Sequence, residues 1–299
     1  MNFFYKRNNI KKNILLKNKT TMKIGGKAEY YCRPSNVDEL LETIRYAMDN
    51  KINYRVLGGG SNLLINDCTI SGLIIDTTGL NKVSISGNSL EAEAGVLVNR
   101  LCRIAIRQSL SGLEFAYGLP GTIGGAAFMN ARCYNGEFSG VVSGVEFIDG
   151  CGQVRRFSSD EIQYSYKKSI FMEHPEFIIT KIILQLKKVK KDEQKTIKVN
   201  SIKNKQDRID KGQFVYPSAG CVFKNNYSIG ISSGKIIDES GLKGFKVGRA
   251  MVYPKHANFA VNTGGAGFQE MFSLIESVEQ KVRAAKNVTL EREITIWEK

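Results

Sequence analysis

The sequence predicts a fold that mixes helices and strands, of the α+β or α/β class. The 299 residues are 42% hydrophobic and 24% charged, close to the average for globular domains, so the chain can bury a substantial core. Helical periodicity alternates with short β-type runs, most clearly between residues 35 and 106. Two glycine-rich turns, at 58–62 and 118–125, separate apolar segments. The length leaves room for two or three domains.

The first element is a helix that we expect to begin at Ser35 and to end near Asn50. Ser35 can serve as its N-cap with Asp38 three residues on, and apolar residues then recur at helical spacing. The pattern that follows predicts strands at 54–57 and 73–76 with an apolar buried segment at 63–65 between them, a hairpin at 83–94 that turns at Gly87-Asn88, and a helix at 97–106.

The second half of the chain continues the mixed pattern. The charged stretch after Lys187 is typical of a connection or a solvent-facing helix, and we expect a domain boundary there. The other predicted elements are a hairpin at 145–157 around Asp149-Gly150, a strand at 177–186, an amphipathic helix at 268–283 and a terminal strand at 293–297.

A formal net charge of +14 makes a nucleic-acid-binding protein one hypothesis. The basic residues concentrate at 6–27 and 187–211, where no aromatic residues are interleaved, and no helix-turn-helix, zinc-finger or RNP pattern occurs. A solvated surface or anionic small-molecule ligands explain the charge better, so we expect no nucleic-acid partner. No apolar run approaches the roughly 18 to 20 residues that span a bilayer, which predicts a cytoplasmic protein without membrane insertion.

The cysteines and histidines limit the chemistry. The six cysteines are widely scattered without a C-x-x-C pair, so most are predicted to be reduced core thiols. His174 and His256 are the two histidines of the chain, which makes a zinc site improbable, and no metal is expected. Acid–base chemistry must therefore fall mainly on other side chains.

Two segments of the sequence carry patterns typical of ligand binding. The glycine-rich turns expose backbone N–H groups that suit a diphosphate, although neither fits a Rossmann or P-loop template, and tight turns between packed strands are the alternative. The segment 216–225 places a thiol, a cation and an amide at Cys221, Lys224 and Asn225. If it is extended, Cys221 and Phe223 point one way and Lys224 the other. A small core residue is the alternative for Cys221.

Several short motifs, each weak by itself, occur in a fixed order along nearly the whole chain. Together they resemble the motif series of the UDP-N-acetylenolpyruvoylglucosamine reductase family. The compact stretch from 169 to 216 resembles the shorter of its two types, which lacks an additional tyrosine-bearing loop. The motifs are Thr20 to Gly26, Gly58 to Leu64, Gly112 to Phe115, Gly118 to Ala126, Met129 to Ala131, Tyr216 to Asn225, Gly241 to Gly244, Lys255 to Asn262 and Leu290 to Glu293.

The resemblance implies a flavoprotein of the vanillyl-alcohol-oxidase-like (PCMH-type) class. Two FAD-binding lobes would occupy 1–79 and 80–190, and an α+β substrate-binding domain 191–299, whose final strand returns to the active site. FAD would be bound non-covalently and NADPH would supply the hydride that converts the enolpyruvyl ether of a UDP-sugar to the lactyl ether of UDP-N-acetylmuramate, for peptidoglycan synthesis. The implied cofactor-binding residues are Gly58, Gly59, Gly60, Ser61, Asn62, Gly118, Pro120, Gly121, Thr122, Gly124 and Gly125.

The resemblance also implies three catalytic residues. Cys221 stands where the family usually has a serine proton donor, Lys167 where it usually has an arginine, and Glu293 where it has a glutamate near the substrate carboxylate. Hydride addition leaves negative charge beside that carboxylate, which calls for a proton donor and a cation. A thiol can donate the proton, whereas a lysine lacks the two-donor fork of arginine, and Lys168 is a candidate to compensate. The implied substrate-binding residues are Tyr166, Lys224, Asn225 and Asn262.

Simpler interpretations stay open for these residues. Lys167 fits a solvated surface lysine, Glu293 an exposed strand carboxylate, Lys224 and Asn225 the polarity of an edge strand, and His256 either a cleft or the core. An oxidase of the same flavin fold, with its flavin tethered through His or Cys, is the alternative among enzymes. A non-enzymatic nucleic-acid-binding protein is the alternative of another class. The expected oligomeric state is a monomer.

Overall fold

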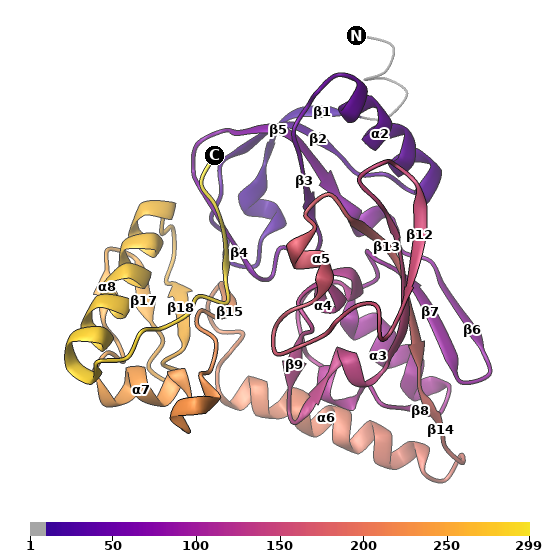
Figure 1. The fold of residues 1–299 in the computed structure, drawn as a ribbon. Coiled ribbons are helices and arrows are strands. Elements are labelled where there is room, and N and C mark those ends of the chain that lie inside the picture. Colours follow the sequence, from indigo (N-terminus) through magenta and orange to yellow (C-terminus); the bar gives the residue numbers. More distant parts are fainter. Residues whose placement is uncertain (1–9) are drawn as a thin grey trace. The chain divides into compact units, whose positions relative to one another are not determined.

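The computed structural model describes residues 10–299, and these form two compact units (Figure 1). Unit 1 contains the chain up to Lys12, Tyr30–Gly59 and Gly72–Asp207. Unit 2 contains Asn13–Glu29, Gly60–Ser71 and Arg208–Lys299. Each unit is therefore assembled from three separate segments. The first residues of the predicted basic stretch, 6–9, lie outside the described part of the chain.

Helix α2 (Val37–Asp49) of unit 1 has its N-cap one residue later than predicted. Asn36 is its N-cap and accepts a hydrogen bond from the Glu39 N–H, so the prediction of Ser35 as cap is wrong. The Glu39 carboxylate also accepts a hydrogen bond from the N–H of Ser35, the residue before the cap, at 2.8 Å. The helix ends at Asn50, as predicted. The neighbouring sheet has the strand order β1 (Lys11–Leu15), β2 (Lys27–Cys32), β5 (Ile70–Asp76), β3 (Tyr54–Leu57).

The second part of unit 1 is a five-stranded antiparallel sheet (Figure 1). Both predicted hairpins are confirmed, and the first turns at Gly87, whose φ is +61°. The turn of the second is longer than the predicted Asp149-Gly150, because the Asp149 carboxylate accepts hydrogen bonds from the N–H groups of Cys151 and Gln153. The strand order is β12 (Val154–Ser158), β11 (Val142–Ile148), β13 (Ile178–Gln185), β7 (Ser89–Glu93), β6 (Val83–Ser86).

Short helices and strands complete unit 1. The predicted helix at 97–106 is confirmed as α3 (Val98–Arg107). The sequence patterns did not predict α4 (Ile123–Phe128), because it is only six residues long and half of its first four are glycines. The remaining elements are α5 (Ile170–Glu173), the pair β9 (Arg132–Cys133) and β10 (Gly136–Glu137), and the pair β8 (Leu110–Ser111) and β14 (Lys187–Lys188).

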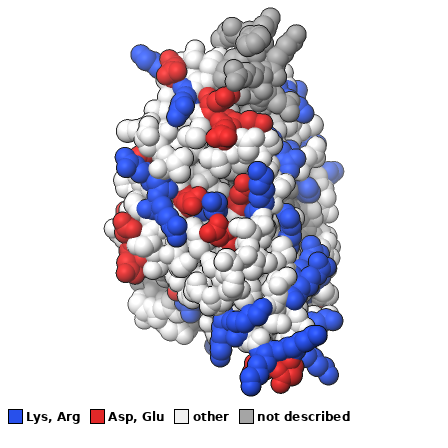
Figure 2. Space-filling model, turned by 90° about the vertical axis from the view of Figure 1, so that its right-hand side faces the viewer, with Lys and Arg blue, Asp and Glu red and all other residues white. Residues whose placement is uncertain are grey.

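The charged stretch after Lys187 contains a helix, α6 (Gln194–Asp210). The lysines of this stretch are exposed, from Lys187 to Lys211, which agrees with a solvated surface. Figure 2 shows Lys and Arg at several places on one face, most densely at its lower edge, with Asp and Glu between them. Within residues 10–299, no helix combines the length and the apolar character needed to cross a membrane.

Unit 2 is a four-stranded antiparallel sheet with two helices. The predicted helix at 268–283 is confirmed as α8 (Phe268–Lys286), and its apolar residues Met271, Leu274 and Ile275 are buried in the core of this unit. The final strand β19 (Thr295–Trp297) pairs in parallel with β4 (Leu63–Ile65). The sheet order is β15 (Ser218–Cys221), β18 (Phe259–Asn262), β17 (Ala250–Val252), β16 (Lys246–Val247), and the second helix is α7 (Ser233–Glu239).

Candidate active site

The two glycine-rich turns predicted from the sequence meet within unit 1. A Cβ atom added to Gly59 would lie 2.5 Å from the Gly121 Cα, and one added to Gly58 would lie 2.8 Å from the Thr122 Oγ1. Gly121 itself has a φ of +107°, which side chains other than hydrogen rarely permit. The two backbones thus approach each other only because these positions are glycines.

The second glycine-rich turn runs directly into α4. Thr122 caps this helix through its Oγ1, which accepts a hydrogen bond from the Gly125 N–H at 3.4 Å. A Cβ atom on Gly124 would lie 2.8 Å from that of Ala94, so a glycine is required for the helix to pack there. At the start of the turn, the Gly118 N–H donates to the Asn99 Oδ1 at 2.7 Å, and Pro120 is exposed.

The end of the first turn belongs to unit 2. Gly60 has a φ of +59°, and its carbonyl accepts a hydrogen bond from the Thr21 N–H at 3.0 Å. Ser61 is half-buried. Asn62 donates from Nδ2 to the Glu293 carbonyl at 2.9 Å, a contact between residues 231 positions apart. This contact ties the turn to the predicted catalytic glutamate through its backbone.

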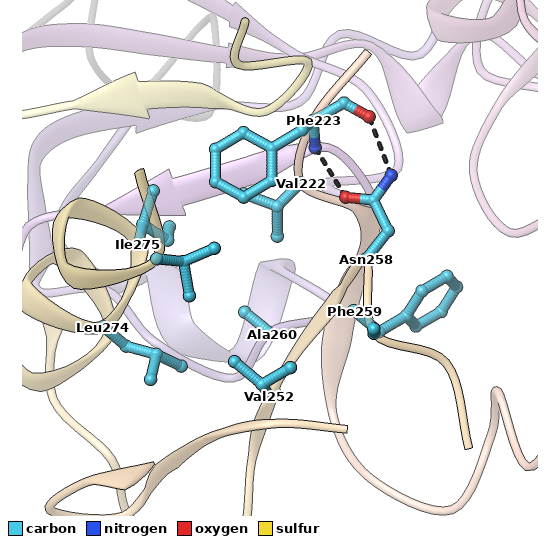
Figure 3. A pocket seen from close by; sticks show the side chains of 10 residues that line it. Val222, Phe223, Val252, Asn258, Phe259, Ala260, Leu274 and Ile275 are labelled. Carbon is cyan, nitrogen blue, oxygen red and sulfur yellow. Dashed lines mark hydrogen bonds between the residues drawn. The ribbon is translucent and has the colours of Figure 1, made fainter. Parts of the chain in front are cut away.

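The segment that carries Cys221 is held from both sides. On one side, Asn258 pins the residues that follow Cys221: its Oδ1 accepts from the Phe223 N–H at 2.9 Å and its Nδ2 donates to the Phe223 carbonyl at 2.8 Å (Figure 3). The Asn258 carbonyl also accepts from the Val222 N–H at 2.9 Å. Asn258 is 4% exposed, so no water competes for these bonds.

On the other side, the same residues pair with the segment that carries Glu293. The Glu293 N–H donates to the Val222 carbonyl at 2.7 Å, and Phe223 forms an isolated β-bridge with Arg292. Val222 therefore links the two predicted catalytic residues of this unit, since it follows Cys221 in the chain and binds Glu293 across the strands. The structure brings together in unit 2 a half-buried thiol and a half-buried carboxylate.

The expected alternation along this segment stops at Cys221. Strand β15 ends there, after a register shift between Ser218 and Cys221 that coincides with a φ of +79° at Gly220. Cys221 packs beside the cluster of Met251, Tyr253, Phe259 and Val261, whereas Val222 and Phe223 both belong to the core that contains α8. The prediction that Cys221 and Phe223 point the same way required an extended segment, and this condition is not met, because the strand ends at Cys221 and the two side chains pack in different clusters.

The predicted substrate-binding residues of unit 2 have protein partners in the structure. The Lys224 ammonium lies 2.6 Å from the Glu291 Oε1 and is 20% exposed. The Asn225 Oδ1 accepts from the Ser233 N–H at the start of α7. Asn262 is 3% exposed, and its amide bonds to the backbone of Met22, Gly264 and Ala266, contacts that favour a role in holding this turn.

His256 lies in unit 2 beside the Asn258 segment. Its ring packs against that of Phe259, with centroids 4.4 Å apart, and its buried Nδ1 has no hydrogen-bond partner among the described residues. Burial lowers the pKa of His256 below its usual value, with smaller contributions from Lys211 and Lys243. The side chain is half-buried, so it matches neither a fully satisfied core histidine nor an exposed one.

The predicted cation of unit 1 lies at a tight turn. Ser165 and Lys168 exchange backbone hydrogen bonds at 3.1 and 3.2 Å, so Tyr166 and Lys167 occupy the two corners. Lys167 has a φ of +55° and is half-buried. Lys168, a candidate to compensate for the missing arginine, forms an ion pair with Glu173 at 2.5 Å.

The prediction that most cysteines are core thiols is wrong. All six are free, but two are buried, two are half-buried, and Cys68 and Cys151 are exposed. Burial raises the pKa of both Cys32 and Cys102 to about 12, so these thiols stay protonated at neutral pH. Cys221 is half-buried and has a carboxylate, that of Glu293, on the neighbouring segment.

Two residues that hold the predicted catalytic segments in place were not identified from the sequence. Asn258 holds the Cys221 segment, and Asn130 (1% exposed) donates from Nδ2 to the Ser165 carbonyl at 2.9 Å beside the Lys167 turn. Both lie inside motifs of the series described above, but nothing in the spacing of these motifs shows what the amides bind.

The chain is similar to known proteins over nearly its whole length. It is 42% identical over 98% of its length to a UDP-N-acetylenolpyruvoylglucosamine reductase of Borrelia garinii subsp. bavariensis, covering 95% of that protein. It is also 42% identical to the reductase of the same name from Borreliella burgdorferi, over 98% of this chain and 97% of that protein. The chain belongs to the UDP-N-acetylenolpyruvoylglucosamine reductase family.

Family models and a solved structure agree with this membership. Residues 28–158 match an FAD binding domain, which includes both glycine-rich turns, and residues 211–297 match the UDP-N-acetylenolpyruvoylglucosamine reductase C-terminal domain, which includes Cys221 and Glu293. The crystal structure of UDP-N-acetylenolpyruvylglucosamine reductase from Thermus caldophilus is similar, with a TM-score of 0.81, 34% identity and coverage of 96% of this chain and 98% of that chain. The predicted fold class is confirmed.

Proposed function

We propose that this reductase family member reduces UDP-N-acetyl-enolpyruvoylglucosamine to UDP-N-acetylmuramate for peptidoglycan synthesis, with NADPH as reductant and FAD as a non-covalent cofactor. Family membership over nearly the full chain supports the reaction. The observation that connects this reaction to particular residues is the backbone pairing at Val222, which follows Cys221 in the chain and accepts a hydrogen bond from the Glu293 N–H. A thiol and a carboxylate on adjoining backbone segments are suited to proton transfer beside a substrate carboxylate.

The glycine-rich turns fit the diphosphate of FAD. A Cβ atom on Gly59 would collide with the Gly121 backbone, and Gly121 has a φ of +107°, so glycine leaves the main chain free of side chains at both positions, and such backbone suits phosphate oxygens. The residues proposed to hold the cofactor are Gly58, Gly59, Gly60, Ser61, Asn62, Gly118, Pro120, Gly121, Thr122, Gly124 and Gly125. When bound, FAD supplies hydride, taken from NADPH, to the terminal vinyl carbon of the substrate.

The protein groups act on the charge and the proton of the substrate. Hydride addition leaves negative charge on the carbon next to the carboxylate, and the Cys221 Sγ donates the proton that this carbon needs. Lys167 stabilises the charged carboxylate, and Glu293 orients it within the local hydrogen-bond network. Tyr166, Lys224 and Asn225 are proposed to contact the UDP-sugar, Lys224 by exchanging its exposed partner Glu291 for substrate oxygens.

Further proposals concern the domains of the protein, its oligomeric state and its cellular compartment. We propose lobes at 1–79 and 80–190 for FAD and a domain at 191–299 for the substrate, in a monomer that acts in the cytoplasm. Six free cysteines agree with a reducing compartment. A small-molecule UDP-sugar is the proposed partner, without nucleic acid.

One experiment tests the function directly. The purified protein should be yellow, bleach anaerobically with NADPH, and recolour on addition of the enolpyruvyl UDP-sugar. A protein that does not bleach contradicts the proposal. Flavin that stays with acid-precipitated protein would favour a flavin-tethered oxidase, and a colourless protein with steeply salt-dependent oligonucleotide binding would favour the nucleic-acid alternative.

A further inference from the structure

A second cation lies beside the Lys167 turn. The guanidinium carbon of Arg132, in β9, is 5.9 Å from the centroid of the Tyr166 ring, and Tyr166 directly precedes Lys167. All three residues belong to unit 1. The Arg132 side chain is exposed, so a ligand can reach it. An arginine over an aromatic face keeps its planar N–H groups available at the edge of the stack.

Two hydrogen bonds tie the segment before Arg132 to the Lys167 turn. The Asn130 Nδ2 donates to the Ser165 carbonyl at 2.9 Å, and the Ser169 hydroxyl donates to the Phe128 carbonyl at 2.5 Å. Asn130 and Ser169 are each 1% exposed, and the Asn130 Oδ1 also accepts from the Ser139 N–H. These bonds flank the turn on both sides, so Arg132 keeps its place relative to Lys167.

The β9–β10 hairpin fixes the base of the Arg132 side chain. Arg132 pairs with Glu137 across the hairpin, and both corner residues, Tyr134 and Asn135, have positive φ angles of 47° and 62°. The Glu137 carboxylate accepts a hydrogen bond from the Ser139 hydroxyl at 2.6 Å. A guanidinium has five N–H donors, so a contact with Glu137 would leave donors for a second acidic group.

We propose that Arg132 binds the carboxylate of the substrate together with Lys167. An ammonium attracts a carboxylate as a point charge, whereas the guanidinium fork donates a hydrogen bond to each of the two oxygens and fixes their plane. The pair thus supplies charge from Lys167 and orientation from Arg132. This inference rests on the proposed function, because it needs a substrate with a carboxylate.

The test compares two ligands on the oxidised, FAD-loaded protein by calorimetric titration. UDP-N-acetylmuramate carries the carboxylate, and UDP-N-acetylglucosamine has the same diphosphate without it. We expect Arg132→Ala to weaken the affinity for UDP-N-acetylmuramate about 10- to 100-fold and to change the affinity for UDP-N-acetylglucosamine by no more than about twofold. Arg132→Lys, which keeps the charge without the fork, should give an intermediate loss. Arg103→Ala, at an exposed arginine of α3, is the matched control and should change neither affinity.

Two outcomes would overturn the inference. Equal weakening of both ligands would assign Arg132 to the diphosphate, and unchanged affinity for UDP-N-acetylmuramate would remove it from the site. Lys167→Arg added to Arg132→Ala should restore part of the affinity, and a complete lack of rescue would also count against a shared carboxylate. If the wild-type protein does not distinguish the two ligands at all, the proposed function fails first.

Discussion

The two predicted catalytic segments are built in opposite ways. The Cys221 segment of unit 2 lies between hydrophobic clusters, and its backbone bonds to Asn258 on one side and to Glu293 on the other. The Lys167 turn of unit 1 is a two-residue corner with a positive φ, held by the Ser165–Lys168 pair and one amide from Asn130. The proposed acid is thus positioned by packing in the core, and the proposed cation by the hydrogen bonds of a single turn.

This difference predicts how substitutions act. Removal of a support of Cys221 should cost stability and activity together, because buried backbone groups lose their partners. Changes at the Lys167 turn should alter substrate affinity with little effect on folding. The predictions below test this contrast.

The largest effect is expected for Cys221→Ala. Loss of the proton donor should slow reoxidation of the reduced protein by the enolpyruvyl UDP-sugar about 100-fold or more, while flavin reduction by NADPH is retained. Stopped-flow absorbance separates the two half-reactions. Cys151→Ala, at an exposed thiol, is the control and should change neither. Equal loss in both half-reactions would refute the role of Cys221 as proton donor.

Lys167→Ala should raise the KM for the enolpyruvyl sugar about 10-fold or more, with an unchanged melting temperature. Alanine and lysine pay a similar cost at a φ of +55°, so the substitution tests the ammonium. Lys167→Arg should preserve or improve activity. Lys195→Ala, at an exposed lysine of α6, serves as the control. Unchanged kinetics in Lys167→Ala would show that Lys167 is a surface residue.

Asn258→Ala should lower the free energy of unfolding by about 3 kcal/mol, since two buried backbone groups of Phe223 lose their partners. Urea denaturation measures this loss. Asn204→Ala removes one half-buried hydrogen bond, which the Asn204 side-chain amide donates to the Glu114 carbonyl, and should lower the free energy of unfolding by about 1 kcal/mol. If the two variants lose the same small amount, the core does not position the Cys221 segment as the contrast requires.

The smallest effect concerns His256. Burial lowers its pKa in the folded state, so the unfolded chain takes up the proton more readily. The stabilisation is present above the unfolded pKa of about 6.5 and is lost as pH falls through the lower folded pKa. Urea titrations at pH 7.5 and 5.5 measure the free energy of unfolding at each pH, and His256→Phe should reduce the difference between the two values. An equally steep pH dependence in that variant would trace the loss to other groups.

Local patterns predicted the elements that have strong periodicity. The helices α2, α3 and α8 and both hairpins of unit 1 follow from apolar spacing and turn residues, with boundaries within a few residues. The cap of α2 is Asn36 and not Ser35, because the Asn36 side chain accepts the hydrogen bond from the Glu39 N–H. The terminal strand β19 was predicted, but the four strands of the unit 2 sheet, β15 to β18, were not, since each contains only two to four residues, too few for a visible alternation.

The sequence by itself determined which positions must be glycine, which segments form helices, and which family the chain resembles. The tertiary structure alone decided that Asn62 meets Glu293, that Lys224 meets Glu291, and that Asn258 holds Phe223. It also decided that Arg132 lies beside Tyr166. The physical reason is that helices and turns depend on neighbours a few residues away, whereas these contacts join residues 34 to 231 positions apart through packing of the whole unit.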